Sequence, residues 1–245
     1  MRAYAIGDIH GQFDKLLQAH DWIAADMAHH GPAPVIHLGD LVDRGPDSAG
    51  VIGFLIQGQQ AGQDWRVLKG NHDRMFTTFL QDATARDPGL RSDLDYMHPK
   101  IGGGPTLASY GIHAPMDRPT PTIHAEAQQA VPLAHRDWLL ARPAQIALGP
   151  WLFVHAGIRP GLPFADQTET DLVWIREPFL SDPRDHGALI VHGHTALDAP
   201  QHYGNRLNLD SGAGYGRALT AVALEGPDVF VLGPKGRQPL HPAQA

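Results

Sequence analysis

The feature that most constrains this chain is a repeated local pattern, in which a short apolar run ends directly in a polar cluster that contains glycine. Residues 3–6, 35–38 and 65–68 are such runs, bounded by Gly, Pro or Asp as buried strands usually are. Between them, apolar residues recur at helical spacing across 13–27 and 51–56. This alternation predicts parallel strands with right-handed crossovers, and ligands of such sheets gather at the carboxyl ends of the strands.

The second half of the chain has further strand-like runs and few helical patterns. A second, more antiparallel sheet packed on the first would account for them. We therefore expect an α/β fold with four layers, an α/β/β/α sandwich with two mixed sheets. The runs lie at residues 151–154, 188–191, 206–209, 219–224 and 229–232.

Residues 82–144 interrupt this regular pattern. They include four consecutive residues Gly102-Gly103-Gly104-Pro105 and a proline-rich stretch at 115–121. We interpret 82–144 as an inserted cap region of a single domain that spans residues 1–245. The alternative interpretation is a poorly ordered surface excursion, because long irregular segments in compact domains are either functional or mobile.

Composition excludes several classes of protein and site. The absence of cysteine removes disulfides, thiolate zinc sites and cysteine nucleophiles. A formal net charge of -7 without a Lys/Arg cluster argues against nucleic acid as the partner. No apolar run is long enough for a signal-peptide core or a membrane span, so we expect a soluble cytoplasmic protein with no membrane partner. Sixteen histidines are an unusual number, although most unplaced ones are expected at the surface or in turns.

The first two polar clusters offer metal ligands and a phosphate-binding group. In Gly7-Asp8-Ile9-His10-Gly11, Asp8 and His10 lie two apart, project to the same side of an extended end and can share one ion. In Gly39-Asp40-Leu41-Val42-Asp43-Arg44-Gly45, the two oxygens of Asp40 suit a bridge between two metals, and Arg44 matches phosphate geometry. The structural alternatives are a helix cap at Asp8 and a surface pair of Asp43 with Arg44.

Three more clusters follow apolar runs farther along the chain. They are Gly70-Asn71-His72-Asp73, the segment 153–157 with His155, and the segment 191–195 with His194. Each places a histidine at a predicted strand end, and the first adds an amide oxygen. Five such strand ends in one chain are difficult to attribute to packing alone.

In this order, the five blocks resemble those of the phosphoprotein phosphatase family within the calcineurin-like metallophosphoesterases. The resemblance extends over residues 4–224 and implies a two-metal site. It implies that one metal ion is bound by Asp8, His10 and Asp40. The other metal ion would be bound by Asp40, Asn71, His155 and His194, so that Asp40 bridges the two ions.

The resemblance also implies the roles of residues around the metals. His72 would donate a proton to the leaving oxygen, and Asp43 would orient its ring. Arg44 would bind phosphate together with Asn71 and with Arg176, whose Trp-x-Arg segment resembles that of bacterial and phage relatives. For Arg176 the alternative is a surface ion pair with Glu177 or Asp171.

Three details refine this resemblance. The segment from His194 to Ala196 lacks a further histidine found in phosphodiesterase branches, which favours the phosphoprotein phosphatase branch. Asp73 occupies a position where the family often has Glu. The side chain expected to hold His72 in place therefore differs from that of the family. His192 is interpreted as a strand-end histidine in preference to a residue that supports the metal site.

These features predict hydrolysis of a phosphate ester by in-line attack of a hydroxide that bridges two divalent metal ions. Manganese is the first choice by resemblance, with iron or zinc as alternatives. The leading substrate is phosphoserine or phosphothreonine in proteins. The alternative is symmetrical hydrolysis of a dinucleoside polyphosphate such as diadenosine tetraphosphate. A silent phosphopeptide-binding module should have lost metal ligands, and every ligand position is present.

Overall fold

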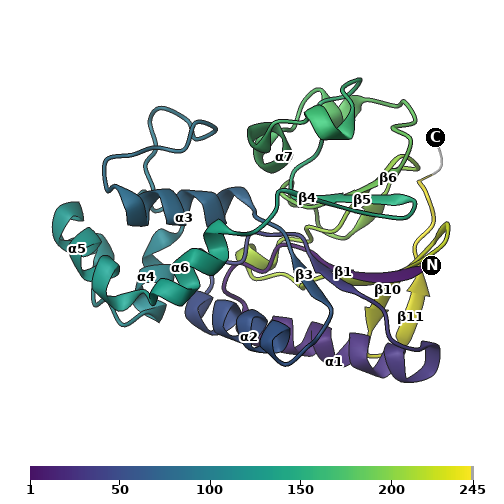
Figure 1. The fold of residues 1–245 in the computed structure, drawn as a ribbon, viewed down its shortest axis with the longest axis horizontal. Helices are drawn as coiled ribbons and strands as arrows, with labels where there is room; N and C mark the ends of the chain where they lie inside the picture. Colours follow the sequence, from purple (N-terminus) through teal and green to yellow (C-terminus); the bar gives the residue numbers. More distant parts are fainter. Residues whose placement is uncertain (244–245) are drawn as a thin grey trace.

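The structure is a computed structural model that describes residues 1–243. Two mixed β-sheets face each other at its centre (Figure 1). The first sheet has six strands, in the order β11-β10-β9-β1-β2-β3. Its first three strands in sequence are parallel, with β1 between β2 and the antiparallel β9. Its strands are β1 (Arg2–Ile6), β2 (Val35–His37), β3 (Trp65–Val67), β9 (Ala221–Glu225), β10 (Asp228–Gly233) and β11 (Gly236–Pro239).

The second sheet has five strands, in the order β4-β5-β6-β8-β7. Its central strands β5, β6 and β8 are parallel, and the two edge strands are antiparallel to their neighbours. The strands are β4 (Gln145–Leu148), β5 (Trp151–Val154), β6 (Leu189–His192), β7 (Gln201–His202) and β8 (Arg206–Asn208).

Side-chain alternation along the strands builds the core between the sheets. Ala3 and Ala5 of β1 pack in the same buried cluster as Trp151 and Phe153 of β5. Tyr4, between the two alanines, points to the other side and joins the helix-side core. Because successive residues of a strand face opposite sides, β1 contributes to both hydrophobic layers of the domain.

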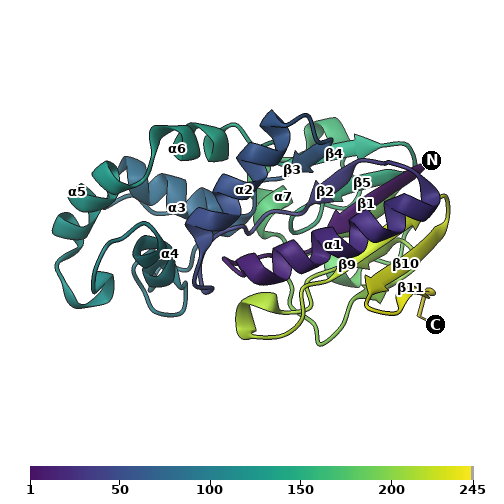
Figure 2. The ribbon, with the colours of Figure 1, turned by 90° about the horizontal axis from the view of Figure 1, so that it is seen from below.

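Helices cover the outer face of each sheet. Helices α1 (Phe13–His30) and α2 (Ser48–Gln60) lie along the first sheet (Figure 2), and α1 buries Leu16 and Ile23 there. On the second sheet, Leu172 of α7 (Glu169–Trp174) packs in one cluster with residues of β5 and β6. The predicted four-layer α/β/β/α fold is therefore confirmed.

Residues 71–140 form a group of helices at one end of the sheets (Figure 1). Within 82–144 the regular sequence pattern is interrupted, yet three α-helices form there. They are short, and Leu107, Ile123 and Leu139 join the buried core of the first sheet. Movement of this region as a cap stays a prediction. The helices are α3 (Asn71–Gln81), α4 (Gly103–Ser109), α5 (Thr120–Ala130) and α6 (Leu133–Leu140).

The expectation of a more antiparallel second sheet was wrong. Its three central strands are parallel, and β9, β10 and β11 from the same half of the chain extend the first sheet instead. An apolar run predicts that a strand will be buried but not which strand it pairs with, because pairing depends on contacts far apart in sequence. None of the helices in residues 1–243 has the length and apolar character needed to cross a membrane.

Candidate metal centre

The five polar clusters meet at one edge of the two sheets. Asp8, Asp40 and Asn71 follow the ends of β1, β2 and β3, and His155 and His194 follow β5 and β6. Parallel neighbours place their carboxyl ends at the same edge, so residues up to 186 positions apart in sequence lie in contact, as between Asp8 and His194. The prediction that these residues gather at strand ends is confirmed.

The backbone at this edge is held in an unusual conformation. Six non-glycine residues among residues 1–243 have a positive φ angle, and five of them belong to the predicted site. These five are His10, Asp40, Asp43, Arg44 and His194, with φ between 48° and 72°. Side chains with a Cβ disfavour this region, and such residues concentrate at functional sites where the surrounding structure holds them in place.

Asp40 lies between two groups of potential ligands. One carboxylate oxygen is 3.4 Å from His10 Nε2, and the other is 3.4 Å from His155 Nε2. The potential ligand atoms of His10, Asp40 and His72 lie within 4.8 Å of one another, as do those of Asp40, His155 and His194. Burial disfavours the charged form of Asp40, but the surrounding histidines outweigh burial and lower its pKa.

Acceptor atoms converge on the side of His155. Its Nδ1 donates to the carbonyl of Leu38 at 2.9 Å, so the lone pair of Nε2 faces Asn71 Oδ1 at 2.9 Å and Asp40. Asn71 Oδ1 is also 2.9 Å from His194 Nδ1. Electron-rich atoms that face one another in a buried site repel unless a cation lies among them, so this donor set fits a metal ion.

Asp8 completes the cluster on the other side. One oxygen accepts the His194 backbone N–H at 2.9 Å, and the other is buried without a hydrogen-bond partner in the described structure. Burial, together with the charges of Asp210 and Asp40, raises the pKa of Asp8 well above its usual value. A Cβ on Gly193 would lie 1.9 Å from Asp8 Oδ1, so only glycine leaves room for this carboxylate. A cation would satisfy the buried oxygen.

The histidines of the cluster are held in their neutral form. Burial is the largest cause that lowers the pKa of His10, His155 and His194. His10 Nδ1 donates to the carbonyl of Val42 at 2.9 Å, which leaves Nε2 as the acceptor. A neutral imidazole with a fixed tautomer is the form that binds metals.

His72 sits beside this cluster in a hydrogen-bonded chain. Its Nδ1 donates to Asp43 Oδ2 at 2.7 Å. The other oxygen of Asp43 accepts from Tyr96 at 2.8 Å and from Thr106 at 2.9 Å. Sequence reasoning did not assign Tyr96 or Thr106 a role, because both lie in the segment whose pattern was weak. Burial raises the pKa of Tyr96, so its hydroxyl stays protonated and donates.

Two arginines flank the cluster. Arg44 donates to His10 Nε2 at 2.6 Å and to His72 Nε2 at 3.0 Å, with its guanidinium 4.7 Å from the ring centre of Tyr215. Arg176 is exposed and lines the same cavity. Asp171 pairs with Arg159 at 2.6 Å, and within residues 1–243 Arg176 forms no ion pair. The alternative interpretation of Arg176 as part of a surface pair is therefore wrong for this structure.

A cavity of about 560 Å³ opens from the cluster. Asp40, Asn71, His72 and His194 line its inner end. Its outer walls come from residues 89–94, from the region around α7 and from the loop that carries Tyr215. A cavity that joins potential metal ligands, a histidine and several arginines can hold an anionic phosphate group.

The comparison with protein families agrees with this chemistry, since the pattern described as calcineurin-like phosphoesterase matches residues 1–229. The chain belongs to the calcineurin-like phosphoesterase family. Members of this family use a binuclear metal centre, and the side chains around Asp40 form two groups that could each hold a metal ion.

Two curated relatives of this phosphoesterase are named for the same kind of substrate. The symmetrical bis(5'-nucleosyl)-tetraphosphatase of Janthinobacterium sp. (strain Marseille) is 30% identical over 163 residues, which is 65% of this chain and 45% of that protein. The chain thus spans less than half of the length of the first relatives it matches. The asymmetrical bis(5'-nucleosyl)-tetraphosphatase PrpE of Bacillus thuringiensis (strain Al Hakam) is 23% identical over 232 residues, 91% of this chain and 90% of that protein.

Among solved structures, the cold-active protein-tyrosine phosphatase of a psychrophilic Shewanella species has the same fold. Its TM-score is 0.63 at 19% identity, and the alignment covers 98% of this chain and 80% of that chain. At this level of identity the likeness concerns the fold alone.

Two residues singled out in the sequence have other roles in this phosphoesterase. Asp73 accepts the backbone N–H groups of Leu41 at 2.9 Å and Gly70 at 2.8 Å, so it fixes the two loops that carry Asp40 and Asn71. The described hydrogen bonds of its carboxylate do not involve the His72 ring. His192 is fully buried next to Arg206, at 3.3 Å, and its described hydrogen bonds involve no residue of the cluster.

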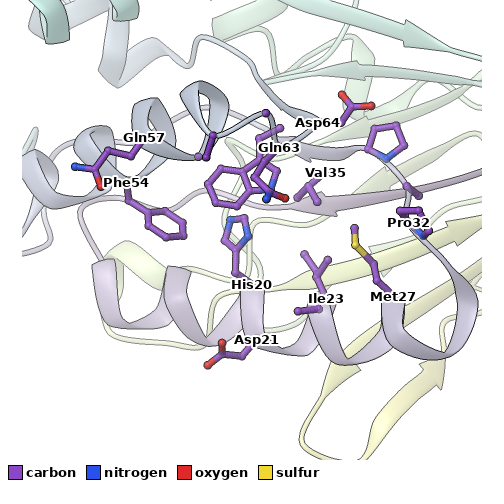
Figure 3. Close-up of a pocket in the computed structure, with 17 residues that line it drawn as sticks. His20, Asp21, Ile23, Met27, Pro32, Val35, Phe54, Gln57, Gln63 and Asp64 are labelled. Carbon is purple, nitrogen blue, oxygen red and sulfur yellow. The ribbon is translucent and has the colours of Figure 1, made fainter.

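A second cavity, of about 840 Å³, lies between α1 and α2 at the opposite edge of the first sheet (Figure 3). His20, Phe54 and Trp65 form much of its wall. Although this cavity is larger, no group of metal-ligating side chains among residues 1–243 lies in it. The two groups of potential metal ligands thus lie at the smaller cavity.

Proposed function

We propose that this phosphoesterase is a metal-dependent hydrolase of dinucleoside polyphosphates. The observation that carries the proposal is the convergence of acceptor atoms on both sides of Asp40, at the inner end of a cavity lined by four arginines. Both kinds of curated relatives described above are named as bis(5'-nucleosyl)-tetraphosphatases, which supports a polyphosphate substrate.

In this proposal, two divalent ions are held by the side chains that surround Asp40. Asp8, His10 and Asp40 would hold one ion, and Asp40, Asn71, His155 and His194 would hold the other. The mixed oxygen and nitrogen ligands suit manganese first, or iron or zinc. When bound, such a pair lowers the pKa of water and stabilises the charge that develops on phosphoryl oxygens.

His72 is the proposed proton donor. Its Nδ1 is fixed on Asp43, which Tyr96 and Thr106 hold from the other side, so Nε2 points toward the cavity. A proton on Nε2 would pass to the oxygen that leaves phosphorus as the phosphoanhydride bond breaks. While Nε2 carries that proton, the Asp43 carboxylate would stabilise the positive charge of the ring.

The arginines are the proposed binding groups for the phosphate chain. Arg44 is next to His72, and Arg176 lies on the same cavity wall, so these two would hold the phosphoryl group under attack together with the Asn71 amide. Arg91 and Arg159 line the outer part of the cavity. In this structure Arg91 and Arg159 pair with Asp93 and Asp171. Arginines beyond the reacting group would suit a chain of several phosphates better than a single phosphate.

A second candidate is a serine/threonine protein phosphatase. It is favoured by the order and spacing of the five motif blocks, which resemble the phosphoprotein phosphatase family. The same metals and the same histidine would serve this reaction, since both substrates present a phosphoryl group to water. The difference lies in what occupies the outer part of the cavity.

One assay separates the two candidates. The protein, supplemented with Mn²⁺, is given diadenosine tetraphosphate, a phosphothreonine peptide and para-nitrophenyl phosphate, with Asp40→Asn as the inactive control. We expect the highest kcat/KM for the dinucleotide, and EDTA should abolish all three activities. Preference for the peptide would support the second candidate.

Product analysis then assigns the bond that is cleaved. Water added across the central anhydride yields two molecules of ADP, whereas cleavage nearer one end yields ATP and AMP. Failure on all substrates without bound metal would contradict the proposed site.

A further inference from the structure

We propose that Asp87 is a positioning residue that fixes one wall of the substrate cavity. The choice of substrate in its test rests on the function proposed above, whereas the structural part of the inference does not. Asp87 lies in a stretch, residues 82–101, that is mostly turns and exposed side chains. Its own side chain is fully buried. A buried carboxylate in an exposed segment requires specific partners.

Asp87 is hydrogen-bonded to α3, the helix that begins with Asn71 and His72. Its two oxygens accept from Arg74 Nε at 2.6 Å and Arg74 Nη2 at 2.7 Å, a bidentate pair. Arg74 lies on α3, two residues after His72. The pair therefore ties residues 82–101 to the helix whose first turn carries Asn71 and His72.

The same carboxylate also accepts a hydrogen bond from the opposite wall of the cavity. Trp174 at the end of α7 donates from Nε1 to Asp87 Oδ1 at 2.8 Å, two residues before Arg176. The Trp174 ring lies 5.8 Å from that of His194. The backbone N–H of Gly89 donates to Asp87 Oδ1 at 2.9 Å, and a Cβ on Gly89 would lie 2.4 Å from the Trp174 ring. Asp87, Arg74, Trp174 and Gly89 together form the Asp87 junction.

The Asp87 junction fixes the position of the residues that follow Asp87 in the segment 82–101. Gly89, Leu90, Arg91 and Leu94 all line the cavity that opens from the metal cluster. They belong to its outer wall, whereas Asp40, Asn71 and His72 form the inner end. A small phosphate ester needs only the inner end, but a substrate with a long leaving group extends along this wall. Asp87 should thus affect large substrates and leave small ones nearly unchanged.

The experiment compares Asp87→Asn with a matched control in the metal-supplemented protein. Asn keeps the shape of the side chain but loses the charge that Arg74 requires. The control is Glu126→Gln, which removes an equally bidentate pair with Arg118, at 2.7 and 2.8 Å, that is half-exposed and outside the cavity. Steady-state kinetics are measured with diadenosine tetraphosphate and with para-nitrophenyl phosphate.

We expect Asp87→Asn to raise KM for the dinucleotide about tenfold, the effect of one lost charge-assisted contact. The kcat/KM for para-nitrophenyl phosphate should change less than about twofold, and Glu126→Gln should match the wild type on both substrates. Trp174→Phe, which keeps a ring but loses the N–H donor, should give a smaller rise in KM for the dinucleotide. A parallel loss on both substrates, or no change on either, would overturn the inference.

Hydrogen exchange tests the junction without any substrate. The Gly89 amide donates to the Asp87 carboxylate, and the Leu90 amide donates to the Asp87 backbone carbonyl in the same turn. Both amides should exchange faster in Asp87→Asn than in Glu126→Gln, because the turn loses its anchor on Arg74 and Trp174. Equal exchange in the two variants would refute the junction. If the wild type does not cleave the dinucleotide but the exchange difference is present, the proposed function fails and the positioning role of Asp87 stands.

Discussion

Two pairs of histidines lie in different parts of the molecule, and only one of them belongs to a candidate metal centre. At the carboxyl ends of the strands, His155 and His194 both lie 2.9 Å from the side-chain oxygen of Asn71. Between α1 and β2 of the first sheet, His20 Nε2 and His37 Nε2 lie 3.0 Å from each other, with the His20 ring next to that of Trp65. Burial lowers the pKa of all four histidines.

The difference between the pairs is the set of oxygen atoms around them. His20 and His37 satisfy each other, because one neutral ring donates and the other accepts. His155 Nε2 instead faces the oxygens of Asn71 and of the buried carboxylate Asp40, and a cation would satisfy these acceptors together. Neutral imidazoles thus arise from burial alone, whereas a metal site also requires buried acceptors next to them.

The largest effect is expected for Asp40→Asn. The amide removes the negative charge shared by the two groups of ligands and should abolish binding of at least one metal ion. We expect activity to fall more than about 10⁴-fold, beyond the typical loss for a single general acid. Metal content and turnover of para-nitrophenyl phosphate measure the outcome. Full metal content with wild-type activity would remove Asp40 from the centre.

His72→Asn should have the next largest effect. The variant should retain its metal ions and lose about 10²- to 10⁴-fold in kcat, because the proton donor to the leaving oxygen is gone. Turnover is compared with metal content in the same samples. Unchanged turnover of para-nitrophenyl phosphate would exclude His72 as the donor, and loss of metal would place it among the ligands, as its distance from Asp40 and His10 allows.

Arg176→Ala should have a smaller effect, confined to binding. Arg176 is exposed on the cavity wall, and the loss of one charge-assisted contact to phosphate should raise KM about tenfold. Steady-state kinetics with Arg184→Ala as the control test this, since Arg184 is also exposed and lies outside the cavity. Equal KM values in the two variants would exclude a role in phosphate binding.

His20→Gln should leave activity unchanged and alter only the pH dependence of stability. Burial lowers the pKa of His20 to about 4 in the folded protein, whereas an unfolded histidine titrates near 6.5. Between these values the unfolded chain binds the extra proton, so the wild-type free energy of unfolding falls as pH decreases, by up to about 1.4 kcal/mol per pH unit. Denaturant unfolding from pH 7 to pH 4 should show a shallower fall in the variant.

A fall of equal steepness in both proteins would mean that His20 does not titrate as its burial requires. A loss of activity in His20→Gln at pH 7 would contradict the distinction between the two pairs, because His20 and His37 would then affect the metal centre.

The sequence by itself determined the residues of the cluster, the fold class and most of the long strands. A strand that ends at Ile6 or His37 follows from its apolar run, and the Gly-Asp or His motif that comes next is local information. Parallel pairing then brings such motifs together, so Asp8 and Asp40 were predictable as neighbours. The motifs do not determine the substrate, because the residues of the outer cavity lie outside them.

Only the tertiary structure decided which strands share a sheet and which residues support the site. The placement of β9, β10 and β11 beside β1 left the second sheet with a parallel centre. Tyr96, Thr106 and Asp87 reach Asp43, Arg74 and Trp174 across 13 to 87 positions of sequence. No local pattern marks such contacts, because a hydrogen bond between distant residues depends on how whole helices and loops pack together.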